Sequence, residues 1–175
     1  MSYRAAAIAN ELLDLAARDN RKLTQIEIQK LVYFSHGWHL ALVGQNLIGE
    51  QIEAWKYGPV VRSLYDAFKK FGSSEITEKA VGWKISNSRL VPSCYPTIQS
   101  ASVEDDACAR AVVQSVWKKY GLIPPFKLVE ITHLNGSPWQ KSQERGDVYI
   151  PNEEIKEYFE RVAAQGFEGR FQGLQ

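Results

Sequence analysis

Residues 24–43 constrain the fold more than any other stretch, because as a helix they are apolar on almost every side. Thr24 and Glu27 have the spacing of a capping box at the start of this helix, and Gly44 suits its end. A helix without a polar face has to be covered all round by other elements. We therefore predict a central, buried helix over about 24–43. Its apolar residues, which spread around most of the circumference, are Ile28, Leu31, Val32, Phe34, Trp38, Leu40, Ala41 and Leu42.

The rest of the chain predicts further helices that pack around this central one. Pro59 suits the first turn of the third helix, where a missing N–H costs nothing, and Ser2 is a candidate cap for the first. Residues 47–55 are expected to form a loop or a short extended piece. Ser137, Pro138 and Trp139 are expected to form a short turn. Apolar residues recur at helical spacing over 2–18, 59–72, 102–121, about 125–135 and behind Asn152.

These patterns indicate a mainly α fold, a compact single-domain bundle of about six helices spanning residues 1–166. The stretch 73–100 has no helical period. Residues 83–85 and 89–91 flank Ser86, Asn87 and Ser88, which predicts a small β-hairpin near 82–92. The last segment, 167–175, contains glycines and is expected to be a flexible tail.

Charge and cysteine content narrow the classes of function. The 21 Lys and Arg residues are balanced by 20 Asp and Glu residues, which argues against a nucleic-acid-binding face. The longest apolar run, residues 40–43, is far too short for a membrane span. Cys94 and Cys108 lack metal-binding spacing, and Cys108 is expected to be partly buried. A reduced, cytoplasmic protein fits best.

A catalytic constellation is not recognisable. The chain lacks a nucleophile elbow, a phosphate-binding glycine loop and a dinucleotide fingerprint, so we predict no cofactor and no enzymatic activity. One alternative is a metal-dependent hydrolase that uses His36, His39 and His133. The favoured interpretation is that His36 is exposed and that His39 is a hydrogen-bonded core residue, so no metal site is predicted.

Two turn segments rich in aromatic residues are the strongest candidates for function. Trp55, Lys56 and Tyr57 precede Gly58 and Pro59 just before a helix, and Trp139 follows Ser137 and Pro138. Such rings either fasten loops onto the bundle or stay exposed as anchors of a protein interface, and both roles can coexist. The candidate partner-binding residues are Trp55, Lys56, Tyr57, Trp83 and Trp139. Trp38, His39, Gly58, Pro59, Ser137 and Pro138 are interpreted as structural motif residues.

Seven separate segments of the chain form a recognisable series: 28–34, 37–41, 52–61, 68–72, 116–121, 130–133 and 136–139. Together they resemble the Panacea domain, the SocA-like antitoxin family that also includes phage-associated GepA proteins. The resemblance runs in order from about Ala5 to Phe159, while residues 73–100 and the tail take no part in it.

This resemblance implies a helical antitoxin that neutralises a toxin encoded beside it. One branch of the family is understood to deliver its toxin to the ClpXP protease, so a ClpXP-type protease is a second implied partner. The resemblance implies no catalytic residues. Two rivals stay open from the sequence: a phage-associated adaptor without a toxin, and a repressor that binds its own operator DNA.

Overall fold

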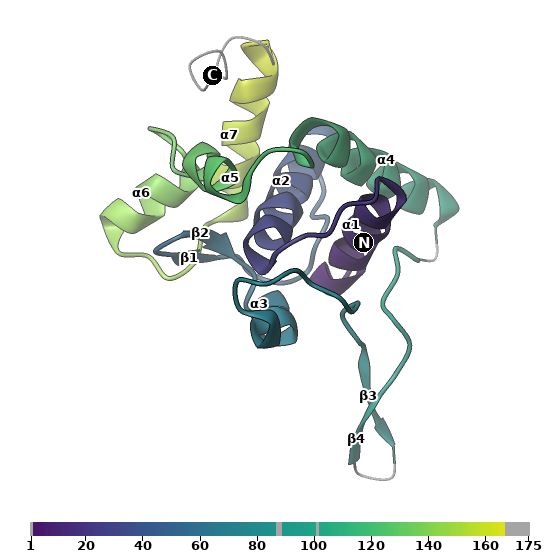
Figure 1. Cartoon of the computed structure of the whole chain (residues 1–175). Coiled ribbons are helices and arrows are strands. Elements are labelled where there is room, and N and C mark those ends of the chain that lie inside the picture. Colours follow the sequence, from purple (N-terminus) through teal and green to yellow (C-terminus); the bar gives the residue numbers. More distant parts are fainter. Residues whose placement is uncertain (1, 87–88, 101, 167–175) are drawn as a thin grey trace.

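The computed structural model describes residues 2–86, 89–100 and 102–166, and it confirms the mainly α fold. The described ranges contain seven helices and two small antiparallel hairpins, arranged as Figure 1 shows. Helix α3 continues into one turn of 3₁₀ helix, Lys69–Phe71. The seven helices are α1 (Ala5–Arg18), α2 (Gln25–Val43), α3 (Arg62–Phe68), α4 (Val103–Tyr120), α5 (Pro125–Thr132), α6 (Pro138–Arg145) and α7 (Asn152–Ala164).

Helix α2 is the central helix that the sequence predicts. Helices α1, α3, α4, α5 and α7 all contact it, and its first sixteen residues are buried except for Ile26. The predicted capping box is present, since the Thr24 N–H donates to Glu27 Oε2 at 2.8 Å and the Glu27 N–H donates to Thr24 Oγ1 at 3.5 Å. Gly44 ends the helix in the left-handed conformation, with φ +75°.

Helices α2 and α7 approach each other closely at Gly37. A Cβ at this position would lie 2.2 Å from the ring of Phe159, so only glycine fits here without a shift of the ring. The Phe159 ring packs edge-on against Trp38, with ring centroids 5.2 Å apart. The Phe34 ring stacks on Tyr120, with ring centroids 4.5 Å apart. These rings join α2, α4 and α7 into one aromatic cluster.

The first hairpin confirms a short extended piece within residues 47–55 and corrects the placement of Pro59 in the first turn of a helix. Residues 53–60 form strands β1 (Glu53–Trp55) and β2 (Gly58–Val60), and Pro59 lies in β2 while α3 begins only at Arg62. The side-chain amide of Gln29 explains this boundary: it accepts from the Val61 N–H at 2.9 Å and donates to the Val61 carbonyl at 3.1 Å. This contact holds Val61 in an extended conformation, with ψ 113°. Helix α3 therefore begins at the next residue, Arg62.

Residues 148–150 extend the first hairpin on its other side. The Ala54 N–H donates to the Val148 carbonyl at 2.8 Å, and the Ile150 N–H donates to the Ile52 carbonyl at 2.8 Å. Glu53 and Tyr149 form an antiparallel bridge between these two contacts. The connection between α6 and α7 therefore lies along β1.

Helix α6 is a seventh helix that the sequence analysis missed. Ser137 accepts from the Gln140 N–H at 3.2 Å as its N-cap, and Pro138 occupies its first position. The same three residues that suggested a turn are therefore a helix start. Helix α5 ends at Thr132 and not at Asn135, and α1 begins at Ala5, where the Glu50 carboxylate and not Ser2 receives the first N–H.

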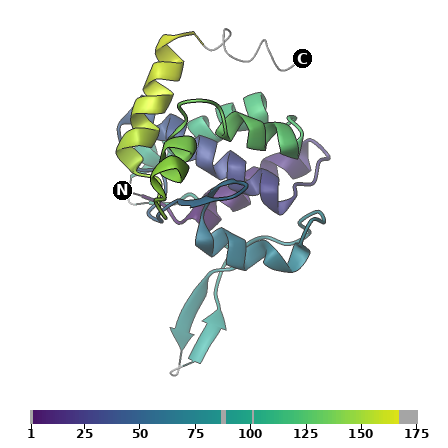
Figure 2. The ribbon, with the colours of Figure 1, turned by 90° about the vertical axis from the view of Figure 1, so that its left-hand side faces the viewer.

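The second hairpin was predicted correctly. Strands β3 (Trp83–Ser86) and β4 (Arg89–Pro92) pair in antiparallel register and project away from the helices, as Figures 1 and 2 show. The predicted flexible tail, 167–175, lies outside the described residues. No helix within the described ranges is long and apolar enough to cross a membrane.

We predict that Gly37→Ala lowers the free energy of unfolding by about 1–3 kcal/mol, although alanine favours a helix over glycine, because the added methyl group overlaps the Phe159 ring. Thermal unfolding followed by circular dichroism measures the change. The double variant Gly37→Ala/Phe159→Leu should recover part of the loss. Strictly additive effects of the two substitutions would contradict the close approach.

Candidate partner-binding site

The β1–β2 turn is the place where the separate sequence segments singled out above meet. In Figure 1 this hairpin lies beside α2, α5 and α6. The indole N–H of Trp139 donates to the Trp55 carbonyl at 2.7 Å, and Gln143 Nε2 donates to the Ala54 carbonyl at 2.5 Å. Two side chains of α6 therefore bind the end of β1 directly.

Trp139 also connects the turn to the end of α5. Its half-buried ring stacks on the imidazole of His133, with ring centroids 3.6 Å apart and planes inclined by 5°. The structure thus brings two of the predicted partner-binding residues, Trp55 and Trp139, into one assembly. Much of the Trp139 ring serves to fasten the turn, as the structural alternative expected.

Lys30 lies directly under the turn. Its side chain is 2% exposed, and Nζ donates to the Pro59 carbonyl at 3.1 Å. A Cβ on Gly58 would lie 2.7 Å from Lys30 Nζ and 2.8 Å from Thr132 Oγ1, and Gly58 has φ +101°. Both the available space and the backbone conformation therefore require glycine at this position.

The buried amine has an unusual electrostatic environment. Burial lowers the pKa of Lys30 to about 7, and in the described part of the chain no carboxylate forms an ion pair with it. Burial, followed by the charge of Lys30, lowers the pKa of His133, whose Nε2 is buried without a hydrogen-bond partner among the described residues. With a pKa of about 7, the Lys30 amine is about half protonated at neutral pH. Because the turn covers Lys30, we interpret the amine as a support of the turn and not as a nucleophile.

The outer surface of the turn is accessible. Tyr57 is 64% exposed and Lys56 is exposed, whereas Trp55 is half-buried. The Trp55 ring lies 4.7 Å from the guanidinium carbon of Arg62 and 4.8 Å from the ring of Tyr65. The indole N–H donates to Glu53 Oε2 at 2.5 Å. The turn therefore presents large side chains on a backbone that is held from several sides.

The structure places the other candidate residues elsewhere. Trp83 lies in β3, within the projecting hairpin and away from the β1–β2 turn in both ribbon views. Trp38 is buried and its indole N–H donates to the Tyr120 hydroxyl at 3.2 Å. His39 is a buried residue whose Nδ1 bonds the Gln45 carbonyl at 2.8 Å, which confirms the prediction for it.

The prediction for His36 was wrong. This residue is fully buried, and its Nε2 lies 3.0 Å from Asn152 Oδ1 at the start of α7. Burial lowers its pKa to about 4. Its angle around the helix suggested a more polar, solvent-facing side, but α2 is covered by other elements on that side too.

Cys108, expected to be partly buried, is exposed. Over the described residues, no three His, Cys, Asp or Glu side chains gather in a way that could hold a metal ion.

Comparison with known proteins assigns the chain to a family. The model of the family described as "Antitoxin SocA-like, Panacea domain" matches residues 28–140. The chain is also similar to Antitoxin SocA of Caulobacter vibrioides (strain NA1000 / CB15N), with 32% identity over 138 residues, 79% of this chain and 69% of that protein. The chain belongs to the SocA-like Panacea family. No solved structure matches it.

The matched range of the Panacea family contains most of the assembly around the turn, from Lys30 to Trp139, and ends just before Gln143. Two exposed apolar residues beside it, Val148 at 63% and Tyr149 at 47%, lie outside that range and were missed by sequence reasoning. The alternating pattern of a strand is too short at 148–150 to be recognised. Their position next to β1 depends on contacts with residues almost a hundred positions away.

We predict that Lys30 makes the stability of this Panacea protein depend on pH. Between the folded pKa of about 7 and the ordinary value of 10.5, the unfolded state binds a proton that the folded state lacks. Stability therefore rises with pH across this window, by up to about 1.4 kcal/mol per pH unit, and the penalty is fully present below pH 7. Urea unfolding at several pH values from 7 to 9.5 measures this slope.

Lys30→Met should lose this part of the slope, since it retains a long apolar stem without an ionisable group. Lys127→Met, at a partly exposed position of α5, is the matched control and should keep the wild-type slope. An unchanged slope for Lys30→Met would show that the amine is solvated in the folded protein.

Proposed function

We propose that this protein is an antitoxin that neutralises the toxin encoded beside it by direct binding, without a catalytic step. Family membership supports the antitoxin role. The single observation that carries the binding mode is the supported, solvent-facing β1–β2 turn, where exposed Tyr57 and Lys56 stand beside half-buried Trp55. We assign Trp55, Lys56 and Tyr57 to the toxin-facing surface.

Interface energetics favour this assignment. Stable complexes bury on the order of 1,600 Å², and a few Trp, Tyr and Arg side chains supply most of the free energy of binding. Because Arg62, Tyr65 and Glu53 already hold the Trp55 ring, binding costs little further side-chain entropy there. The adjacent Val148 and Tyr149 extend the apolar area that a partner can cover.

Toxin neutralisation has two candidate routes. The antitoxin masks the active surface of the toxin, or it delivers the toxin to a ClpXP-type protease. We favour masking, because it requires only that the turn binds the toxin and needs no second partner. Measuring the half-life of the toxin in cells with and without the ClpX subunit separates the two, because only delivery shortens the half-life when the antitoxin is present.

The runner-up function is a phage-associated adaptor without a toxin. A neighbouring gene that is harmless when expressed alone would favour the adaptor.

The decisive test is co-expression with the neighbouring open reading frame. We expect the neighbour to stop growth alone and to permit growth beside this protein. Tyr57→Ala should weaken the complex at least tenfold in calorimetry, about 1.4 kcal/mol, and reduce rescue. Tyr95→Ala, at a similarly exposed tyrosine outside the turn, is the matched control and should stay within twofold of wild type.

Two results would contradict the proposal. A neighbour that stays toxic beside this protein removes the antitoxin role. If Tyr57→Ala and Trp55→Ala each bind the toxin as tightly as wild type, and Trp55→Ala keeps its native helix content, the turn is not the toxin-facing surface.

A further inference from the structure

The segment just before β3 pairs its backbone on one side. The Gly82 N–H donates to the Cys94 carbonyl at 3.1 Å, and the Ser93 N–H donates to the Gly82 carbonyl at 2.6 Å. Two residues earlier, the Asn10 side chain accepts from the Ala80 N–H at 2.8 Å and donates to the Ala80 carbonyl at 3.0 Å. The same Asn10 amide also donates to the Pro96 carbonyl. Asn10 therefore links the segment at Ala80 to the segment at Pro96, beyond the point where their backbones stop pairing directly.

This pairing leaves the opposite edge of the segment unused. In extended backbone the N–H and C=O groups of successive residues point to alternate sides. The backbone N–H and C=O groups of Ala80 and Gly82 point toward the segment that carries Cys94 and Pro96. Those of Lys79 and Val81 therefore point away from it. Within the described residues, the backbone groups of Lys79 and Val81 make no hydrogen bond. Residues 79–82 belong to no strand, but an open backbone edge next to β3 is a template onto which another strand can pair.

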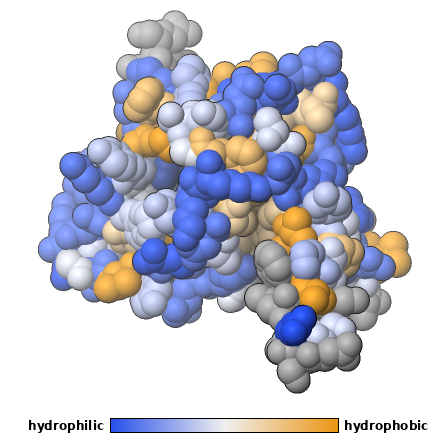
Figure 3. All heavy atoms as spheres, turned by 60° about the horizontal axis from the view of Figure 1, so that its bottom comes forward, coloured by the Kyte–Doolittle hydropathy of each residue, from blue (hydrophilic) through white to orange (hydrophobic). Residues whose placement is uncertain are grey.

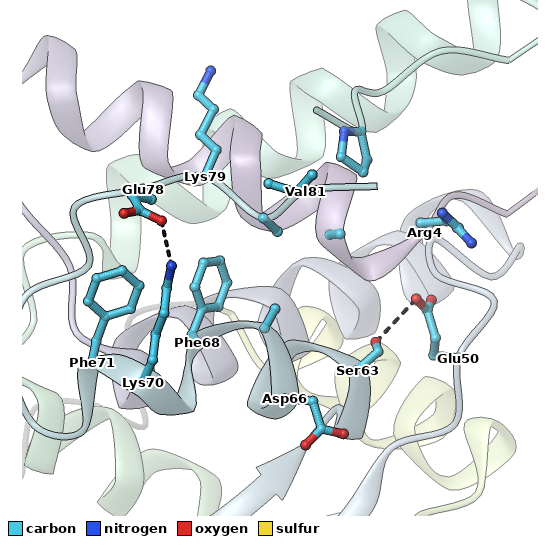
Figure 4. A pocket seen from close by; sticks show the side chains of 14 residues that line it. Arg4, Glu50, Ser63, Asp66, Phe68, Lys70, Phe71, Glu78, Lys79 and Val81 are labelled. Carbon is cyan, nitrogen blue, oxygen red and sulfur yellow. Dashed lines mark hydrogen bonds and ion pairs between the residues drawn. The ribbon is translucent and has the colours of Figure 1, made fainter. Parts of the chain in front are cut away.

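A groove of about 570 Å³ runs between α3 and residues 78–81. In Figure 4 the rings of Phe68 and Phe71 rise from α3 and its 3₁₀ turn toward the segment that carries Glu78 and Val81. Ala67 also lines this wall and is exposed. The space-filling view of this side of the molecule shows apolar residues close to the projecting hairpin (Figure 3).

The charges along the groove are largely paired within the protein. Lys70 bonds Glu78 at 2.5 Å, and Lys79 bonds Asp14 at 2.7 Å. The Glu50 carboxylate receives the Ala5 N–H at 3.0 Å. Arg4, at the α1 end, forms no ion pair among the described residues. An occupant therefore needs little charge of its own, apart from a carboxylate that would suit Arg4.

We propose that this groove binds an extended segment of the toxin, which adds as a strand to the open edge at Lys79 and Val81. The segment is largely uncharged, and its alternate apolar side chains pack on Phe71 and Ala67, above the buried ring of Phe68. Backbone hydrogen bonds supply affinity, and the apolar wall of α3 supplies specificity. This inference rests on the proposed antitoxin function for the identity of the partner, and it adds a second contact surface to the β1–β2 turn.

The test uses overlapping 15-residue synthetic peptides that cover the neighbouring protein, with binding to the full chain measured by fluorescence anisotropy. We expect one peptide to bind. Val81→Pro, which removes the N–H from the open edge, should weaken that peptide at least tenfold. Val81→Thr keeps both the N–H and the branched side chain and should stay within threefold of wild type.

A second pair of variants guards against misfolding of the proline variant. Ala67→Glu fills the groove from the exposed face of α3 and should also weaken the peptide at least tenfold. Ala107→Glu places the same side chain on an exposed position of α4, outside the groove, and should have no effect.

The outcomes separate this inference from the proposed function. If the full-length neighbour forms a complex but no peptide binds, or if Ala67→Glu and Val81→Pro bind the peptide as wild type does, the groove is not the site. If the neighbour neither stops growth nor binds, the antitoxin function fails as well.

Discussion

The burial of α2 on all sides is the constraint on which the rest of the structure depends. Five other helices and strand β2 contact it, and polar residues of α2 are buried together with its apolar ones. Such groups are tolerated in a core only when they are hydrogen-bonded. Gln29 and Lys30 meet this requirement by binding the backbone at Val61 and Pro59. The polar positions of the central helix therefore determine where the β1–β2 hairpin lies.

The candidate site follows from that arrangement. Lys30 supports the turn from below, and Trp139 holds it from the side while stacking on His133. Because these contacts use the inner side of the hairpin, its outer side remains available, and Tyr57 is exposed there. An antitoxin that acts by binding needs this kind of preorganised surface and no reactive group. The groove beside α3 provides a different kind of contact, in which backbone hydrogen bonds at an open edge are combined with an apolar wall.

Sequence reasoning succeeded where a pattern is local and failed where tertiary contacts decide. The apolar positions of residues 24–43 alone were enough to predict a central helix, and residues 83–92 were enough to predict a hairpin. Pro59 was misplaced because proline suits both a first helical turn and an edge strand, and only Gln29, thirty positions earlier, favours the strand. His36 was thought exposed because helical angles cannot show how much of α2 is covered. The aromatic turns pointed to Trp55, Tyr57 and Trp139, whose role in partner binding stays a prediction. The convergence of Lys30, Thr132 and His133 on them has no signature in one sequence.

The most direct test of the account is amide hydrogen exchange of this protein with and without the full-length product of the neighbouring gene, followed by mass spectrometry. Exchange in peptides that cover residues 53–60 and 147–150 should slow strongly in the complex, because a partner that covers the turn excludes water from those strands. Unchanged exchange over both segments in a fully formed complex would contradict the claim that the supported turn is where the partner binds.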